Sequence, residues 1–331
     1  MPGGDVTGRI LVLGGAGRFG RAAALAFRTA GWQVASLVRG TSAAAAAPGT
    51  EIIEVDARDT ESVIAAATGA DVVLHALNVP YTDWARLAVP FADTAIAAAQ
   101  RSGATLVFPG NVYNYGAAMP ALIDETTPMQ PTSRKGAMRV AIEARMRDAA
   151  STGLRTIVLR AGDYFGGEGL GSWFDRVVIK EISAGHLSYP GPLDIVHEWA
   201  YLPDLAQALV RLAEARAQLA PFAEFGFPGH AVTGRAFTTA IARACRREFK
   251  VDFMPWRMLR LMGIVVPVFR ELSELSYLWS TPHAIDGTRL SAIIGEPPHT
   301  PLDEAITDAL AALGLRRRAD GGGKSHANPA R

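Results

Sequence analysis

The sequence predicts an α/β fold in which a doubly wound parallel sheet is followed by a smaller C-terminal lobe. Short apolar runs alternate with alanine-rich helical segments from residue 9 to about residue 165, a pattern typical of repeated strand–helix–strand units. The first run, ILVLGGAGRFG at residues 10–20, ends in three glycines. After Gly166 the pattern becomes irregular and rich in glycine and proline, as expected for the loops of a separate lobe.

The three glycines indicate a dinucleotide-binding turn between a buried strand and a helix at about residues 18–30. Gly14 allows the tight turn, Gly17 lets backbone N–H groups approach a pyrophosphate, and Gly20 lets the helix pack closely on the strand. A second apolar stretch follows at residues 32–38, which distinguishes this context from a plain glycine turn. The candidate cofactor residues here are Gly14, Ala16, Gly17, Arg18, Phe19 and Gly20.

Composition limits the classes of function. Lysine and arginine number 33 against 32 acidic residues, so the formal net charge of +1 gives no electrostatic footprint for nucleic acid. The single cysteine, Cys245, excludes an intrachain disulfide and is expected to be a buried structural thiol. The seven histidines form no pair at metal-ligand spacing, so we predict no metal site.

The chain is expected to be cytoplasmic, with no membrane partner. Its first apolar run is the dinucleotide strand itself, so no signal peptide is predicted. The most apolar later stretch, residues 258–269, is interrupted by Arg260 and Pro267 and is too short to span a bilayer. Further helices are predicted at residues 203–217, 234–247, 255–278 and 302–313. Residues 40–50 are expected to form a short helix or a mobile loop.

The glycine spacing GxxGxxG resembles that of extended and atypical short-chain dehydrogenase/reductases, the NAD(P)-dependent epimerase/dehydratase family. Five later segments resemble the family in the right order, over roughly residues 8–315: IIEVDARD (52–59), DVVLHALN (71–78), TLVFPGNVYNYG (105–116), TIVLRAGDYFG (156–166) and HEWAYLPDLAQAL (197–209). The first four imply strands three to six of a Rossmann-type sheet. The fifth resembles the segment that begins a helix near the substrate lobe.

The resemblance also implies a domain division and further site residues. Residues 1–166 would form the NAD(P)-binding domain, with the sheet completed by segments near 194–215. Residues 167–315 would be mainly the substrate lobe, and residues 316–331 a disordered tail. Asp56 and Ala57 would lie near the adenine, and Ala76, Leu77 and Asn78 would pass under the cofactor. Substrate contacts are expected from Tyr164, Phe165 and His197.

The sequence favours NADP as the cofactor, and NAD is the alternative. Relatives that prefer NAD usually carry an acid at the end of the second strand, but residues 32–50 contain no Asp or Glu. Arg39 ends this strand and can pair with a 2′-phosphate, while Arg18 can approach from the other side. The alternative is that both are simply solvated arginines.

The family's catalytic pair, a Tyr with a Lys four residues later, is missing. The corresponding segment PTSRKGAMR places Lys135 in the tyrosine position and Arg139 in the lysine position, one helical turn apart and facing the same cleft. Arg139 is expected to bind the nicotinamide ribose. Lys135, beside a permanent positive charge, is expected to donate a proton near neutral pH. The upstream Ser or Thr is also absent and Asn111 lies in its neighbourhood, so Tyr113 or Tyr164 is the alternative phenol.

Three functions are compatible with this pattern. The first is an NADP-dependent oxidoreductase acting on a carbonyl or sugar-like small molecule, which the lobe landmarks Asp163, Tyr164, His197 and Asp204 favour. The second is a non-catalytic NADP(H)-sensing regulatory protein, which the missing Tyr–Lys pair favours. The third is an NAD-dependent nucleotide-sugar epimerase or dehydratase, whose chemistry relies most strongly on the Tyr that is missing here. A small-molecule substrate is the expected partner, and a homodimer is compatible with all three.

Overall fold

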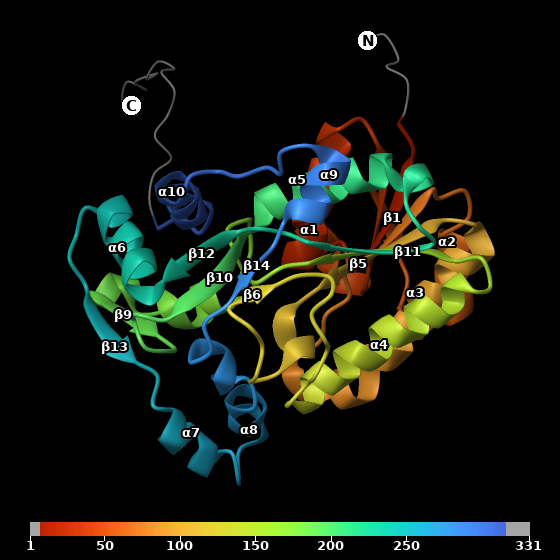
Figure 1. The fold of residues 1–331 in the computed structure, drawn as a ribbon. Helices are drawn as coiled ribbons and strands as arrows, with labels where there is room; N and C mark the ends of the chain where they lie inside the picture. The colour runs from red at the N-terminus through yellow and green to blue at the C-terminus, as the bar shows by residue number, and fades with distance from the viewer. Residues whose placement is uncertain (1–6, 316–331) are drawn as a thin grey trace, which may run out of the picture.

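A computed structural model describes residues 7–315, and a seven-stranded parallel sheet forms its centre (Figure 1). From one edge to the other, the strands are β11 (Phe222–Gly226), β7 (Arg155–Arg160), β5 (Thr105–Gly110), β4 (Val72–His75), β1 (Arg9–Leu13), β2 (Gln33–Val38) and β3 (Glu51–Glu54). The chain reverses its direction of winding between β1 and β4, the point where doubly wound sheets bind ligands. The predicted fold class is therefore confirmed.

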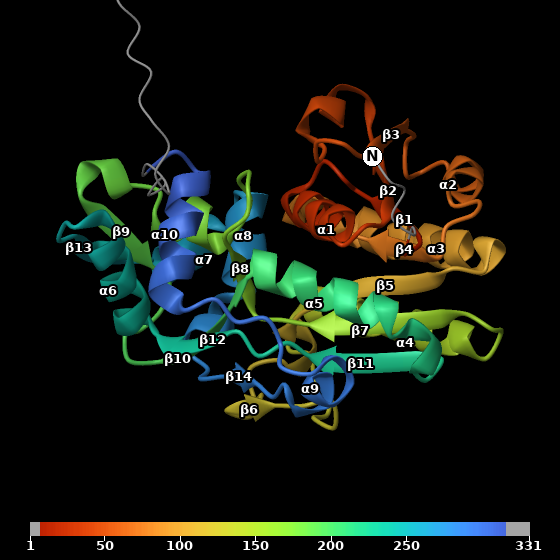
Figure 2. The same ribbon diagram turned by 90° about the horizontal axis from the view of Figure 1, so that it is seen from above.

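Helices cover both faces of this sheet (Figure 2). On one face α1 (Arg18–Thr29) packs against α5 (Leu202–Glu214). On the other face lie α2 (Thr60–Ala66), α3 (Trp84–Ser102) and α4 (Arg134–Ala150). Each face has its own apolar core, so the inner strands are buried on both sides. This double burial explains why the strands are nearly continuous apolar runs in the sequence.

The lobe has a separate, aromatic-rich core. It contains a three-stranded sheet of β8 (Asp163–Phe165), β10 (Val196–Tyr201) and β12 (His230–Thr233), and two strand pairs, β9 (His186–Tyr189) with β13 (Lys250–Phe253) and β6 (Leu122–Ile123) with β14 (Ala284–Ile285). The helices α6 (Gly234–Cys245) and α10 (Leu302–Ala312) pack together beside it. Cys245 is half-buried against this core rather than fully buried.

The strand that completes the central sheet differs from the prediction. Residues 194–215 were expected there, but β11 pairs with β7 at the sheet edge. The predicted segment instead supplies β10 to the lobe sheet and α5 to one face of the central sheet. Burial of Trp199 among the lobe aromatics explains why β10 belongs to the lobe.

The predicted helices at 203–217, 234–247 and 302–313 correspond to α5, α6 and α10 and are confirmed. The single helix predicted at 255–278 is wrong. The structure has α7 (Trp256–Met262) and α8 (Pro267–Ser273), followed by a 3₁₀ turn at Ser276–Trp279, because Pro267 lacks an N–H donor and starts a new helix.

Of the remaining segments, Gly40–Ala45 forms a 3₁₀ helix, and the helix α9 (Thr288–Ile294) packs on α5 and β11. The predicted disordered tail at 316–331 lies outside the described residues. Among residues 7–315, no helix combines the length and apolar character needed to cross a bilayer.

Candidate functional site

The glycine turn between β1 and α1 requires glycine at two positions. Gly14 has φ +87°, and a Cβ there would lie 3.0 Å from the Ala76 carbonyl oxygen at the end of β4. A Cβ on Gly20 would lie 2.3 Å from the Gly14 carbonyl oxygen, so the helix can approach the turn only without a side chain. Both glycines therefore shape the turn as the sequence predicted.

Gly17 has a different role, because it faces open space. It is the N-cap of α1, and a Cβ at this position would meet only the Gly14 carbonyl oxygen, at 3.3 Å. The N–H groups of the first helical turn have no acceptors within the helix and carry its positive dipole end. An open cradle at such a helix terminus fits the pyrophosphate of a dinucleotide.

Arg18 ties the glycine turn to the loop that follows β8. Its Nε and Nη2 donate to the Gly166 carbonyl oxygen at 2.9 and 2.6 Å, and its Nη1 pairs with the Asp175 carboxylate. Burial alone would raise the pKa of Asp175, but hydrogen bonds from Ser172 and Gly171 and the charge of Arg18 lower it. The expected contact of Arg18 with a 2′-phosphate is therefore wrong in this arrangement, because its guanidinium is committed to the lobe.

Arg39 is exposed at the carboxyl end of β2. Its positive charge helps to lower the pKa of Asp56, which follows β3. The Asp56 carboxylate accepts hydrogen bonds from Arg58, which lower its pKa to about 2. The neighbouring Ala57 is buried in the core of the α2 face. Arg39 is thus the remaining candidate for a 2′-phosphate at the adenosine end of the sheet.

Arg139 on α4 is a partly buried cation, and within the described residues its one hydrogen bond goes to a neutral group. Its Nη1 donates to the Pro109 carbonyl oxygen at 3.1 Å, and its guanidinium carbon lies 5.1 Å from the Trp84 ring centre and 5.0 Å from that of Phe108. No carboxylate within the described residues forms an ion pair with it. Burial lowers its pKa, yet a guanidinium stays charged at neutral pH. Such a cation can bind the polar group of a ligand.

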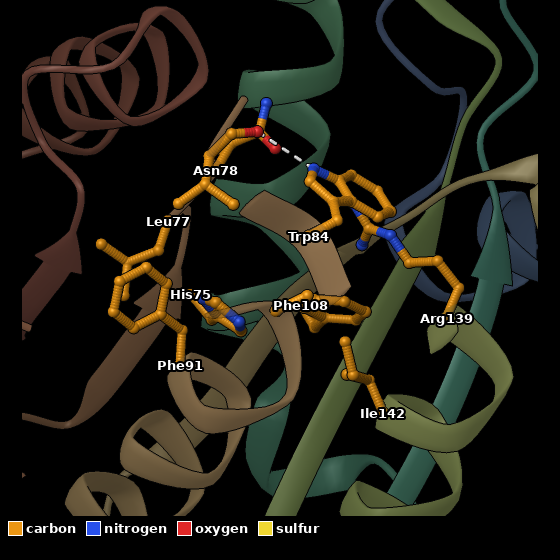
Figure 3. Close-up of a pocket in the computed structure, with 10 residues that line it drawn as sticks. His75, Leu77, Asn78, Trp84, Phe91, Phe108, Arg139 and Ile142 are labelled. Carbon is orange, nitrogen blue, oxygen red and sulfur yellow. Dashed lines mark hydrogen bonds between the residues drawn. The ribbon is translucent and has the colours of Figure 1, made fainter. Parts of the chain in front are cut away.

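Arg139 borders a small cavity at the carboxyl ends of β4 and β5 (Figure 3). The volume of about 30 Å³ holds a water molecule or a ligand hydroxyl group. His75 also lines it, and burial with the charge of Arg139 lowers the pKa of this imidazole to about 3. His75 Nδ1 is buried without a hydrogen-bond partner. Leu77 and Asn78 form the cavity wall nearest the glycine turn, where Gly14 meets Ala76.

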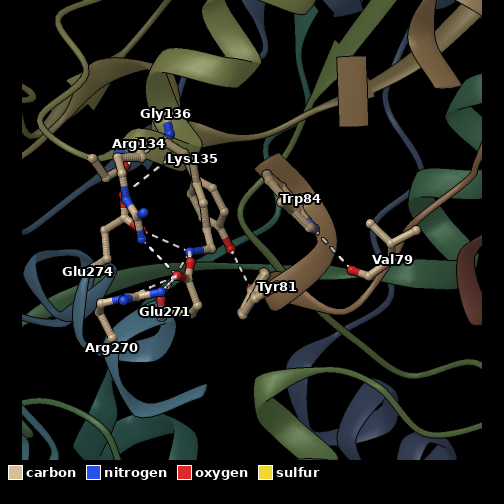
Figure 4. A network of polar contacts seen from close by, with 11 residues as sticks. Val79, Tyr81, Trp84, Arg134, Lys135, Gly136, Arg270, Glu271 and Glu274 are labelled. Atoms are coloured by element: carbon tan, nitrogen blue, oxygen red, sulfur yellow. Dashed lines mark hydrogen bonds and ion pairs between the residues drawn. The ribbon is translucent and has the colours of Figure 1, made fainter. Parts of the chain in front are cut away.

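Lys135 is enclosed in a cluster of carboxylates rather than open to a cleft (Figure 4). Its side chain is 0% exposed, and Nζ donates to the Glu274 carboxylate at 2.8 Å, to the Glu271 carboxylate and to the Glu271 carbonyl oxygen at 3.2 Å. These acceptors occupy all three donors of the ammonium. The expectation that Lys135 is the proton donor is therefore wrong in this arrangement, because no N–H is left for a substrate.

The other polar candidates lie around Arg139. Asn111 Oδ1 accepts from the Tyr113 backbone N–H at 3.0 Å and so caps the turn after β5. The Tyr113 hydroxyl is buried against that of Tyr81, 3.2 Å away. Tyr164 packs on Phe19 of α1, with ring centres 5.5 Å apart, and its hydroxyl has no hydrogen bond within the described residues. Burial raises the pKa of Tyr164 to about 12, while the nearby Arg139 charge acts to lower it.

Two expected substrate residues belong to the lobe core instead. Phe165 is 0% exposed and packs among aromatic rings from several lobe elements. His197 is 2% exposed, stacks on Trp279 at 4.1 Å and hydrogen bonds to Asp163 at 2.9 Å. Neither side chain is available to a substrate, because aromatic packing and the Asp163 contact enclose them. Asp204, expected as a lobe landmark, accepts from the Thr300 backbone N–H at 2.6 Å.

The sequence-based prediction missed four residues that shape this site: His75, Trp84, Glu271 and Glu274. His75 had a usable signal, since a polar residue at the carboxyl end of a parallel strand is a site candidate. Within residues 7–315, no three His, Cys, Asp or Glu side chains gather in a group that could hold a metal ion.

Together, the sheet and the glycine turn define an α/β fold of the doubly wound class. A model of the NAD dependent epimerase/dehydratase family matches residues 10–223, and the chain belongs to this family. No curated protein sequence shows a significant match.

Solved structures share the fold at low sequence identity. UDP-glucose 4-epimerase from Brucella ovis in complex with NAD has a TM-score of 0.74 and 18% identity, covering 93% of this chain and 98% of that one. UDP-glucose-4-epimerase from Stenotrophomonas maltophila, with bound NAD and formylated UDP-arabinopyranose, has a TM-score of 0.73 and 17% identity, covering 94% and 100%. L-threonine dehydrogenase from Phytophthora infestans has a TM-score of 0.73 and 17% identity, covering 92% and 99%.

Proposed function

We propose that the protein is an NADP-dependent oxidoreductase acting on a small carbonyl or sugar-like compound. The observation that carries the proposal is the partly buried Arg139 guanidinium, which has no carboxylate partner within the described residues and borders a cavity sized for a hydroxyl group. This residue stands where the family has the lysine that holds the nicotinamide ribose. A ribose hydroxyl would supply a second acceptor, beside the Pro109 carbonyl oxygen.

The rest of the cofactor would lie along the carboxyl edge of the sheet. The open cradle at Gly17 would hold the pyrophosphate, and the exposed Arg39 would pair with the 2′-phosphate. When bound, the nicotinamide supplies or accepts the hydride. The absence of any acid between residues 32 and 50 supports NADP over NAD.

Tyr164 is the proposed proton donor to the substrate oxygen. Its hydroxyl is unpaired, and the phenol is protonated at neutral pH because burial raises its pKa to about 12. The Arg139 charge would stabilise the phenolate that forms when the proton is transferred. Tyr113 is less suited, because its hydroxyl is already buried against Tyr81.

The test follows NADPH absorbance while the protein is mixed with a panel of aldehydes, ketones and keto-sugars. We expect oxidation of NADPH with at least one compound. Tyr164→Phe should lower kcat about 100-fold and leave the cofactor Kd unchanged. Arg139→Met should raise the Kd as well. The control is Arg145→Met, on the same helix at an exposed side chain, which should alter neither.

The competing function is a non-catalytic NADP(H) sensor, favoured by the enclosure of Lys135, which leaves the family's tyrosine position without a free donor. Tight NADPH binding with no turnover on the panel would support the sensor and contradict the oxidoreductase. UDP-glucose with NAD belongs in the same panel, because two structural neighbours are sugar-nucleotide epimerases with bound NAD. Interconversion of that sugar would favour the epimerase alternative.

A further inference from the structure

The hairpin formed by α7 and α8 presents an unusually apolar surface. The two helices project from the body, and the loop between them lies at their far end (Figure 1). Ile264 and Val265 in this loop are 79% and 83% exposed. The exposed apolar residues around them are Met258, Leu261, Met262, Val266 and Val268. Large exposed apolar patches often mark interaction sites, so this tip is a candidate interaction surface.

The exposed charged side chains of the hairpin have one sign, since Glu271 of α8 is buried. Residues 253–270 contain Arg257, Arg260 and Arg270, all exposed, and no Asp or Glu. Arg260 donates to the Ser276 hydroxyl, so its charge is not neutralised there. Arg270 approaches Glu271 only at 3.4 Å, and that carboxylate already holds Lys135 and Arg134. The apolar tip is therefore flanked by exposed cations whose charge is complementary to an anionic partner surface.

An anionic lipid surface satisfies both properties at once. Aliphatic side chains at a tip enter the boundary between headgroups and acyl chains, while flanking arginines contact lipid phosphates. Each helix has seven residues and is about 10 Å long, which suits a hairpin lying in the interface. Phe253, 61% exposed at the base of the hairpin, is an apolar aromatic residue of the kind found on the lipid-facing side of interfacial helices.

A second copy of the chain fits this surface less well. In a symmetric dimer whose two-fold axis passes through this surface, each hairpin would meet the same hairpin of the partner. Arg257, Arg260 and Arg270 would then face the same three cations across the interface, with no acid in residues 253–270 to pair with them. Like charges opposed in this way disfavour association.

We propose that the α7–α8 hairpin docks the protein onto an anionic lipid bilayer, with Ile264 and Val265 entering the headgroup region. This differs from the sequence-based expectation of no membrane partner, which considered only spanning segments. The docked element is directly linked to the candidate site, because Glu271 of α8 and Glu274 hold Lys135, one helical turn from Arg139. Docking would thus bring the site close to the bilayer surface.

The experiment is co-sedimentation of the full-length protein with vesicles. One set contains phosphatidylcholine alone, and the other contains phosphatidylcholine with phosphatidylglycerol. We expect at least about tenfold stronger partitioning to the anionic vesicles, weakened by raised salt. The double variant I264D/V265D should lose at least about tenfold in partitioning. The control Ile293→Asp, at a 42% exposed apolar residue on α9, should bind as the parent does.

Two results would overturn the proposal. One is equal partitioning of the parent protein and I264D/V265D to anionic vesicles. The other is no vesicle binding together with a dimer by light scattering that the double variant dissociates, which would assign the surface to a second copy. NADPH affinity measured by calorimetry should be unchanged in the double variant, because the tip lies outside the cofactor site. A reduced affinity would mean that the substitutions disturb the fold. The triple replacement of Arg257, Arg260 and Arg270 by Gln would then test the proposal. Loss of the preference for phosphatidylglycerol would support it, and retention of that preference would overturn it.

Discussion

Lys135 Nζ lies 2.8 Å from the Glu274 carboxylate, so an ion pair joins α4 of the nucleotide-binding part to the end of α8. With Glu271, it places a fully enclosed cation where the family has its catalytic tyrosine. The position has thus become part of the contact between two segments that lie more than 130 residues apart in the sequence.

Lys135→Met should therefore lower stability. Its removal leaves two carboxylates without their shared cation, which we expect to cost about 2–4 kcal/mol of the free energy of unfolding. Urea unfolding followed by tryptophan fluorescence measures this. Arg134→Met is the matched control, since that side chain is 62% exposed and should cost less than about 1 kcal/mol. Unchanged stability with lost turnover would instead restore Lys135 as a catalytic residue.

The sequence predicted those parts of the molecule that local interactions determine. The close approach of Gly20 to the Gly14 carbonyl oxygen involves atoms six residues apart, so the glycine spacing was sufficient to identify the turn. Pro267 is likewise a local signal, because a proline favours the first turn of a helix and α8 begins at this residue. Helix boundaries elsewhere followed from apolar periodicity.

The contacts of the charged residues could not be predicted in this way. The acceptors of Arg18 lie 148 or more residues away in sequence, and those of Lys135 lie at least 136 away. A single sequence indicates that such cations need partners, but it does not identify the residues that serve as partners. The placement of β10 in the lobe likewise depends on packing of Trp199 against Phe237, two residues on different elements.

Gly17→Val should abolish binding of both nicotinamide cofactors while leaving the protein folded. Gly17 has φ −74°, which any residue adopts, and its Cβ direction is open apart from one oxygen at 3.3 Å. The side chain would then occupy the space proposed for the pyrophosphate. Calorimetry measures the affinity, and circular dichroism reports the fold.

Gly20→Val is the matched contrast, three residues further on. Its Cβ would clash with the Gly14 carbonyl oxygen at 2.3 Å, so this variant should lose stability in urea unfolding. If Gly17→Val bound either cofactor normally, the glycines would only shape a turn.

Arg39→Asp should reduce affinity for NADP and spare NAD. Loss of a charge-assisted contact to the 2′-phosphate is worth about 1–3 kcal/mol, and the new carboxylate would repel that phosphate. Titration calorimetry with each cofactor gives the two affinities. Arg101→Asp makes the same charge change at an exposed site near the end of α3 and should affect neither. Equal affinity of the parent protein for both cofactors would refute the NADP preference.

Glu198 should make stability fall as pH rises through the neutral range. This carboxyl group on β10 is 1% exposed, and burial raises its pKa to about 8 even though the Gly229 and Ile285 backbone N–H groups donate to it. The folded protein therefore retains a proton that the unfolded chain releases near pH 4.5. The stability from this group is fully present below about pH 4.5 and is lost as pH approaches 8.

The expected decline is at most about 1.4 kcal/mol of unfolding free energy per pH unit, measured by urea unfolding between pH 5 and pH 8. Glu198→Gln cannot titrate, so its stability should be lower at pH 5, where one backbone N–H loses its acceptor, but should decline less with pH. Glu54→Gln, at an exposed residue of β3, should follow the parent curve. A Glu198→Gln curve parallel to the parent's would show that the folded protein holds Glu198 ionised throughout, with the two backbone N–H groups outweighing the effect of burial.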